Sequence, residues 1–169
     1  MAHIITHHEL LEILHYDALS GVFTWRVRKP GMPVGSVAGA TGANGYRYIA
    51  IKRKKYLAHR LAWFYVHGVW PRIIDHLDRV KSNNRLSNLR ECKSQSENHE
   101  NLGLSKANKT GATGVRYDPL HCPSRPYRAD ISKLGNHVYL GSYETLEQAR
   151  DAYVSAKKIH HTSLPYLKE

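Results

Sequence analysis

Two segments of the chain have the apolar spacing of helices. Near the N-terminus, Thr6 precedes Glu9 by three residues, as in a capping box, and apolar residues recur at helical spacing as far as Leu14. Residues 59–67 are aromatic or aliphatic on most sides and are followed by Gly68, as expected of a buried helix that ends at a glycine. The pattern predicts a short first helix and a second helix in the core.

Between these helices the pattern changes to that of strands. Residues 22–27 and 46–51 are predicted strands, and a stretch rich in Gly and Pro over residues 30–45 separates them. Lys54-Lys55 is predicted to close a turn before a further strand at residues 56–58. This part of the chain is therefore expected to contain strands and a hairpin.

The C-terminal third alternates apolar and polar residues in three short runs. Residues 114–117, 127–132 and 137–143 are predicted strands. Thr145 and Gln148 then form a capping box that opens a helix with one apolar stripe, which can close over one side of the sheet. The predicted fold class is α+β, ending in a three-stranded antiparallel sheet packed on one helix.

The stretch over residues 73–101 has little apolar periodicity and is rich in Asp, His, Asn and Ser. Such residues are unsuited to a hydrophobic core and can take part in catalysis. Hydrolysis of a phosphodiester needs a base for the attacking water and a hard cation with oxygen ligands. Asp75, His76 and Asn98 supply such groups within about two dozen residues. Taken alone, an Asp-His pair is more often a turn with a hydrogen-bonded imidazole, so the catalytic interpretation depends on the motifs that flank it.

The charge of the chain indicates a polyanionic partner. Lys and Arg outnumber Asp and Glu by 25 to 14, a net charge of +11, with 15 against 8 in residues 1–104 and 10 against 6 in residues 105–169. A basic surface spread over a folded chain attracts nucleic acid through counterion release. No stretch approaches the ~18 apolar residues of a membrane span, so a membrane partner is not expected.

Cysteine usage and the first residues predict where the protein works. Cys92 and Cys122 are too few for a disulfide framework, and no Cys or His spacing fits a structural zinc site. Residues 1–6 lack the pattern of a secretion signal. We therefore expect a cytoplasmic protein without structural zinc.

Short motifs spread over residues 16–101 carry a family resemblance. They are Tyr16-Asp17, Gly21-Val22-Phe23-Thr24-Trp25, Gly45-Tyr46-Arg47-Tyr48, His59-Arg60-Leu61-Ala62-Trp63, Asp75-His76, Asn84-Arg85, Asn88-Leu89-Arg90 and Asn98. Together they resemble the HNH endonucleases abundant in bacteriophage genomes, a group associated with intron and gene homing. The resemblance implies a ββα-metal nuclease domain over residues 1–104, with its core at about 56–104, and places the protein in the cytoplasm of the host cell if a phage encodes it.

The same resemblance assigns roles to individual residues. It implies His76 as general base and Asp75 and Asn98 as ligands of one divalent cation, Mg²⁺ or Mn²⁺. Asn101 and His99 are the alternatives to Asn98 as second ligand. The groups expected to support the site are Asn84 and Asn88, which would brace its loop, and His59, as a structural or substrate-orienting residue.

Motifs in residues 110–161 carry a second resemblance. They are Thr113-Gly114-Val115-Arg116-Tyr117-Asp118, Tyr127-Arg128-Ala129-Asp130-Ile131, Leu140-Gly141-Ser142-Tyr143 and Glu147-Gln148-Ala149-Arg150-Asp151-Ala152-Tyr153. They resemble the plant apetala-two/ethylene-response-factor DNA-binding domain, whose sheet lies in the major groove. The resemblance implies such a domain at residues 113–169 after a linker at 105–112. Its candidate DNA contacts are Arg116, Arg128, Lys133 and Tyr139.

These observations predict a metal-dependent endonuclease that nicks double-stranded DNA and has no small-molecule substrate. Further DNA contacts are expected from Arg53, Lys54, Lys55 and Arg85. A DNA-binding regulator with an inactive HNH domain is the rival hypothesis, and an RNA-directed protein is a third, since charge alone does not tell RNA from DNA. The sequence does not predict the target site or the oligomeric state.

Overall fold

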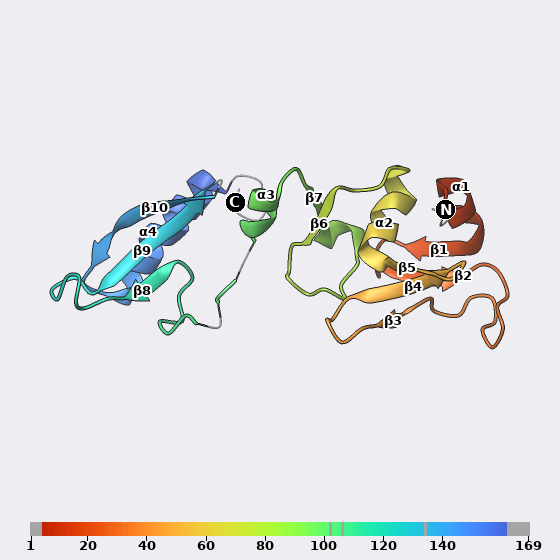
Figure 1. Cartoon of the computed structure of the whole chain (residues 1–169), viewed down its shortest axis with the longest axis horizontal. Coiled ribbons are helices and arrows are strands. Elements are labelled where there is room, and N and C mark those ends of the chain that lie inside the picture. The colour runs from red at the N-terminus through yellow and green to blue at the C-terminus, as the bar shows by residue number, and fades with distance from the viewer. Residues whose placement is uncertain (1–4, 102, 106, 134, 162–169) are drawn as a thin grey trace. The chain divides into compact units, whose positions relative to one another are not determined.

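The structure, a computed structural model, forms two compact units, Met1–Lys93 and Ser94–Glu169 (Figure 1). The residues it describes are 5–101, 103–105, 107–133 and 135–161. Lys106 of the predicted linker, together with Leu134 and residues 162–169 of the predicted C-terminal domain, lies outside them. The α+β fold class is confirmed, whereas the boundary near Leu104 stays a prediction. Across the described ranges no helix is long and apolar enough to cross a membrane.

The first unit combines helices with three small antiparallel sheets, whose strand orders are β1-β2, β3-β4-β5 and β6-β7. The two predicted helices are confirmed, and each predicted strand is found within a few residues of its expected bounds. In chain order the elements are α1 (His7–Ile13), β1 (Leu14–Asp17), β2 (Val22–Trp25), β3 (Ala40–Thr41), β4 (Arg47–Ile51), β5 (Lys54–Leu57), α2 (Ala58–His67), β6 (Ile73–His76), the 3-10 helix η1 (Leu86–Asn88) and β7 (Leu89–Cys92).

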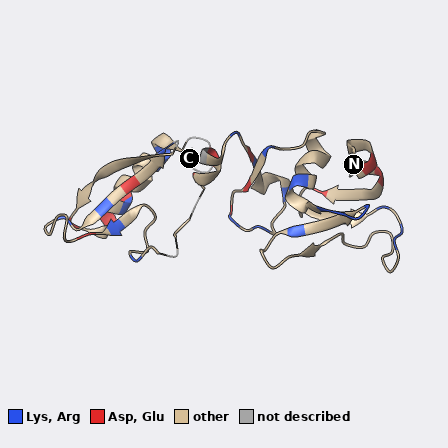
Figure 2. Cartoon of the chain, in the orientation of Figure 1, with Lys and Arg blue, Asp and Glu red and all other residues tan. Residues whose placement is uncertain are grey.

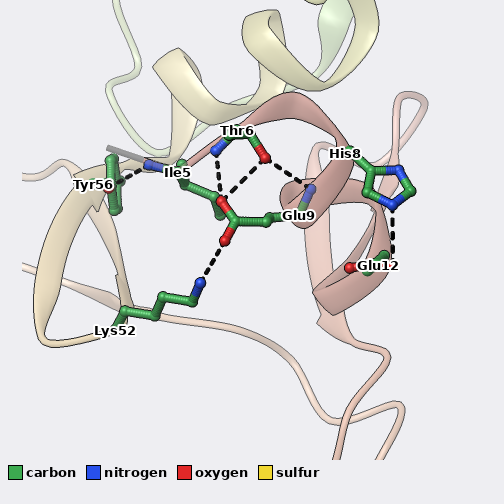
Figure 3. A network of polar contacts seen from close by, with 7 residues as sticks. All are labelled: Ile5, Thr6, His8, Glu9, Glu12, Lys52 and Tyr56. Carbon is green, nitrogen blue, oxygen red and sulfur yellow. Dashed lines mark hydrogen bonds and ion pairs between the residues drawn. The ribbon is translucent and has the colours of Figure 1, made fainter. Parts of the chain in front are cut away.

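Helix α1 begins at the predicted capping box and is tied to the β4–β5 hairpin (Figure 3). The Glu9 carboxylate accepts the Thr6 backbone N–H at 2.8 Å and pairs with the Lys52 ammonium. The hydrogen bonds from Lys52 and Thr6 lower the pKa of Glu9 to about 2. The Ile5 N–H donates to the Tyr56 hydroxyl at 3.2 Å. These contacts fix the start of the chain against β5.

Helix α2 supplies one wall of the core. Leu61 and Ala62 are fully buried, and the helix ends at Gly68, which takes the left-handed conformation with φ 70°. Across the core the sheet β3-β4-β5 contributes Ile49, which is also fully buried. The other buried residues of this cluster are Ile5, Leu10, Leu14, Tyr16, Phe23, Trp25, Ala38, Ile51, Tyr56, Ala58, Phe64 and Leu89.

The β4–β5 hairpin corrects one sequence prediction. The turn falls at Lys52 and Arg53, because Ile51 pairs directly with Lys54, so the predicted turn at Lys54-Lys55 is wrong. Lys52 and Arg53 have positive φ values of 48° and 64°. Two-residue turns of this kind favour Asn-Gly, which reach positive φ at low cost. Because Lys52 and Arg53 are neither glycine nor asparagine, their identities did not indicate a turn at this position.

The second unit is built around one sheet and one long helix. Its strands pair in the order β10-β9-β8, all antiparallel, and the predicted capping box of Thr145 and Gln148 opens the helix α4. Ala129 and Ile131 of the sheet and Ala149 and Tyr153 of the helix are buried in the space between them. The elements are α3 (Gln95–His99), β8 (Val115–Tyr117), β9 (Tyr127–Lys133), β10 (Asn136–Tyr143) and α4 (Leu146–His160).

Candidate active site

The two residues predicted to do the chemistry stand at the end of β6. Asp75 pairs directly with Arg90 on β7, and His76, the last residue of the strand, pairs with Leu89. The Arg90 guanidinium donates to the Asp75 carboxylate at 2.8 Å, and both side chains are almost buried, at 11% and 12% exposure. Arg90 therefore fixes the orientation of the carboxylate, a role that sequence reasoning did not assign. Asp75 and Arg90 lie 15 residues apart in the sequence, and the register between β6 and β7 brings them together.

His76 is buried and held by an amide. Its Nε2 atom lies 3.1 Å from Oδ1 of Asn84, which is itself 1% exposed. An amide oxygen can only accept, so Nε2 donates in this contact, and a neutral imidazole that makes it has Nδ1 as its acceptor nitrogen. This tautomer is the one that a general base acting through Nδ1 would need.

Asn84 is positioned by a hairpin that lies far away in the sequence. The Tyr16 hydroxyl, whose pKa is raised by burial, donates to the Asn84 carbonyl oxygen at 2.7 Å. The Leu86 N–H donates to the carbonyl oxygen of Ala18 at 3.0 Å. Gly21, with φ 75°, packs so closely that a β-carbon there would lie 2.4 Å from the Asn84 carbonyl carbon. The turn between β1 and β2 thus supports the residue that orients His76.

The loop after His76 is braced from within. Asn88 Nδ2 donates to Asp78 Oδ1 at 2.9 Å and to the carbonyl oxygen of Asn83 at 2.8 Å, and Asn83 Nδ2 donates to Asp78 Oδ2. Burial acts to raise the pKa of Asp78, but hydrogen bonds from Asn83, the Val80 N–H and Asn88 outweigh it and lower the pKa. Arg79 in the same loop has φ 64°, a conformation that favours glycine.

Aromatic rings pack around the His76 imidazole. The His59 ring lies edge-on at 5.0 Å between centroids, and the Tyr46 ring lies 6.0 Å from His76 and 5.2 Å from His59. His59 is 6% exposed, and burial, reinforced by the charges of His76 and Arg60, lowers its pKa to about 3. The Lys81 ammonium lies 4.9 Å from the centre of the Tyr46 ring. His59 is therefore neutral at pH 7. The sequence motifs included Tyr46, but neither it nor Lys81 was assigned to the site.

The candidate metal ligands are divided between the units. Asp75 lies in the first, whereas Asn98 and the alternative His99 lie on α3 of the second, and the alternative Asn101 follows that helix. Among the residues described, no group of three or more His, Cys, Asp or Glu side chains is arranged to hold a metal ion. Mg²⁺ is usually held by one or two carboxylates, water and substrate phosphates, and Asp75 fits such a set.

Three of the four DNA contacts predicted in the second unit share one face of its sheet. Arg116 and Arg128 pair directly, so their side chains point to the same side. Asp130 joins them, 3.0 Å from Arg116 and 3.4 Å from Arg128, and the Arg128 guanidinium lies 4.7 Å from the Tyr139 ring centre. Strand alternation places Lys133 on the opposite face of the sheet from Arg128. Its ammonium lies 3.4 Å from the His160 imidazole of α4.

The basic residues predicted in the first unit do not form one cluster. Arg53 is exposed in the turn, while Lys54 and Lys55 follow on β5 and point to opposite faces of the sheet. Lys54 lies over the Tyr56 ring, 5.4 Å from its centre. Arg85 is exposed beside Asn84. Figure 2 shows Lys and Arg in both units.

Comparison with known families gives a match over part of the chain. Residues 56–106, less than a third of the chain, match the family model of HNH endonucleases. The matched segment includes β6, β7 and α3, in the ββα order expected of that family. Residues 56–106 are therefore similar to HNH endonucleases, which supports the prediction of a DNA-cleaving hydrolase.

A comparison with solved structures matched a structure of the HNH homing endonuclease I-HmuI, which describes DNA binding and cleavage by that enzyme. It is 20% identical in sequence, with 89% of this chain and 88% of that chain covered and a TM-score of 0.41. The comparison with curated proteins gave no match.

Proposed function

We propose that the chain is a divalent-metal-dependent endonuclease that nicks double-stranded DNA, with His76 as the general base. The observation that carries the proposal is the buried contact between His76 Nε2 and Asn84 Oδ1 at 3.1 Å. It supports an imidazole that donates from Nε2 and presents Nδ1 to a water, beside a carboxylate held in place by Arg90. Binding DNA alone would not require a buried imidazole in a fixed tautomer.

In the proposed reaction, Nδ1 of His76 takes a proton from a water whose oxygen bonds to the phosphorus of the scissile phosphate. The bond from phosphorus to the departing sugar oxygen breaks. A bound Mg²⁺ or Mn²⁺, liganded by Asp75 and Asn98, would offset negative charge on the phosphate and on the leaving oxygen. His59, which is neutral, adds no positive charge next to the proposed base. One such site cuts one strand at a time.

The proposal is tested with supercoiled plasmid in Mg²⁺, in Mn²⁺ and in EDTA. We expect conversion to nicked circles with either metal and none in EDTA. The variant Asp75→Asn is expected to nick at least about tenfold more slowly, because a neutral amide is a poorer ligand for a hard cation. Tryptophan fluorescence reports whether this variant is folded, since removing one partner of a buried ion pair is destabilising.

The matched control for Asp75→Asn is Asp151→Asn, the same substitution at an exposed position of α4 in the second unit. It is expected to nick as fast as the unmodified chain. Nicking that survives EDTA would overturn the metal requirement. Failure of the unmodified chain to nick in any metal would favour a DNA-binding regulator with an inactive nuclease domain.

For the second unit we propose that the face bearing Arg116, Arg128 and Tyr139 binds duplex DNA. The direct pairing of the two arginines supports this, because it presents two guanidinium groups on one side of the sheet. Asp130 between them lowers the local net charge and holds both side chains in place. Guanidinium groups so arranged suit phosphate and guanine equally.

The double variant Arg116→Gln with Arg128→Gln is expected to weaken duplex binding and to lower the slope of log K against log salt by up to about 2, because each phosphate contact contributes roughly 0.9. The matched control removes two charges from α4, with Arg150→Gln and Lys158→Gln, both exposed. Fluorescence anisotropy of a labelled duplex over a salt series measures both. Equal slopes in the two double variants would refute the assignment.

The turn of the β4–β5 hairpin yields a second prediction about DNA. Lys52 is engaged by Glu9, whereas Arg53 stands exposed at φ 64°. We expect Arg53→Gly to raise the free energy of unfolding by about 0.5–1 kcal/mol, since glycine suits this turn position. The same change should weaken binding of a labelled duplex at low salt, because one cationic contact is lost. Unchanged affinity would remove Arg53 from the DNA-binding surface.

A further inference from the structure

A hollow of about 630 Å³ opens on the outer face of the β3-β4-β5 sheet, away from the residues of the proposed reaction. Its floor is made of small residues, among them Gly39, Ala40 and Ala50, so the face of the sheet lies open. Met32 of the loop between β2 and β3, which is 47% exposed, and Tyr48 of β4 also line it. The volume is that of a small-molecule site rather than of a packing defect.

The lining combines apolar surface with one sign of charge. Of the described residues that line the hollow, Lys29 and Lys55 are the charged ones and none is acidic. The Lys29 ammonium lies 3.4 Å from the centre of the Trp25 ring and donates to the carbonyl oxygen of Ala50 at 3.2 Å. Burial lowers the pKa of Lys29, so a negative charge brought close to it would be favourable. The chemistry suits a flat apolar group attached to an anion.

Trp25 adds a donor that needs an acceptor. The residue is 3% exposed, and its indole Nε1 is buried without a hydrogen-bond partner in the described part of the chain. A buried donor left unpaired is costly, and a ligand with a carbonyl oxygen or a ring nitrogen would satisfy it only where the lining around Trp25 shifts to uncover Nε1. The nucleobases of DNA carry such acceptors on their edges.

A series of contacts links the hollow to the catalytic end of the unit. Asn44 donates to the Tyr48 hydroxyl at 2.8 Å, and its carbonyl oxygen accepts from the Lys81 ammonium at 3.2 Å. Lys81 lies over the Tyr46 ring, which in turn lies 6.0 Å from the His76 ring. These contacts connect the lining of the hollow to the residues around His76 within the first unit.

We propose that the hollow binds one unstacked nucleobase of the DNA substrate, with its neighbouring phosphate at Lys29 or Lys55. The proposal rests on the proposed function in naming DNA as the source of the base. Stacking of a base on an aromatic side chain is sequence-tolerant, so the hollow would hold the strand without selecting a sequence. The N-terminal segment would thereby contribute a substrate contact outside the matched nuclease segment of residues 56–106.

The chain offers a direct probe, because Met1 and Met32 are its two methionines. In the full chain labelled with ¹³C at the methionine methyl groups, titration with deoxyadenosine or thymidine monophosphate is expected to shift the Met32 signal saturably and to leave Met1 in place. Deoxyribose 5-phosphate, which lacks the base, is expected to shift Met32 far less. An equal shift with the sugar phosphate would make the hollow an anion site and overturn the proposal, as would no Met32 shift at all.

A matched pair of variants locates the effect. Ala50→Phe places a ring in the hollow and is expected to abolish the Met32 shift, whereas Val34→Phe lies on the same loop as Met32 outside the lining and is expected to keep it. On plasmid, Ala50→Phe should raise KM about fivefold or more with little change in kcat, since stacking of one base corresponds to about 5-fold to 150-fold in affinity. Identical behaviour of the two variants would overturn the proposal.

These measurements separate the two proposals. The methyl titration uses nucleotides that are not cleaved, so it gives a result even if the chain does not nick DNA. Nicking by a chain whose Met32 signal ignores nucleotides would leave the proposed function standing and end the proposal of a base site.

Discussion

Replacement of His76 by alanine is expected to slow metal-dependent nicking of plasmid by about 10²–10⁴-fold, the usual contribution of a positioned general base. The expectation follows from the geometry of the imidazole, since the contact with Asn84 Oδ1 leaves Nδ1 as the proton acceptor. Single-turnover nicking rates at saturating protein measure the effect on the chemical step. Duplex affinity should stay within about twofold, because His76 is 5% exposed and contributes little surface to DNA.

Two further variants make this test specific. His76→Ala leaves Asn84 without the imidazole, so a folded state must be verified by tryptophan fluorescence and circular dichroism. His8→Ala, at a helix surface where the imidazole is 84% exposed and pairs with Glu12, controls for loss of a histidine as such. A folded His76→Ala protein that nicks at the rate of the His8→Ala protein would show that a group other than His76 accepts the proton of the attacking water.

An intermediate case separates catalysis from positioning. Tyr16→Phe removes the hydroxyl that donates to the Asn84 carbonyl oxygen and leaves the rest of the ring in the core. If Asn84 acts by orienting His76, this change should lower kcat moderately and leave KM unaltered. Because Tyr16 lies far from the matched nuclease segment in the sequence, such a result would make the β1–β2 turn a working part of the site.

Local signals in the sequence predicted the helices well. The capping boxes at Thr6 and Thr145 and the glycine after His67 are short-range patterns, and a helix depends on contacts within four residues. The β4–β5 turn was misplaced because Lys52 and Arg53 adopt a conformation that their side chains disfavour. Nothing in their identities indicates positive φ.

The candidate site was predictable as a set of residues but not as an arrangement. The support of His76 comes from Asn84, whose own position depends on Tyr16, 68 residues earlier in the chain. The pairing of Asp75 with Arg90 requires the register of two four-residue strands, which are too short to show a clear period. Lys133 was grouped with Arg128, yet a separation of five residues in a strand places the two on opposite faces.

The buried imidazoles also connect the site to the stability of the first unit. His59 packs against His76 and Tyr46 near the centre of the unit, and the surrounding protein favours its neutral form. A group that folding keeps neutral is protonated more readily in the unfolded chain, so protons draw the equilibrium toward unfolding. Acid should therefore weaken the same packing that holds His76.

His59 is expected to make the first unit lose stability as the pH falls from 6.5 toward 4. Its pKa is about 3 when folded against 6.5 as the ordinary value, so between these pH values the unfolded state binds one proton more and stability rises with pH. Each pH unit is worth about 1.4 kcal/mol, which gives on the order of 2–3 kcal/mol between pH 6.5 and 4.5. Urea unfolding followed by tryptophan fluorescence measures it, since all three tryptophans lie in the first unit. His59→Gln should flatten this dependence and His8→Gln should retain it; a dependence that survives His59→Gln would assign the acid sensitivity to other groups.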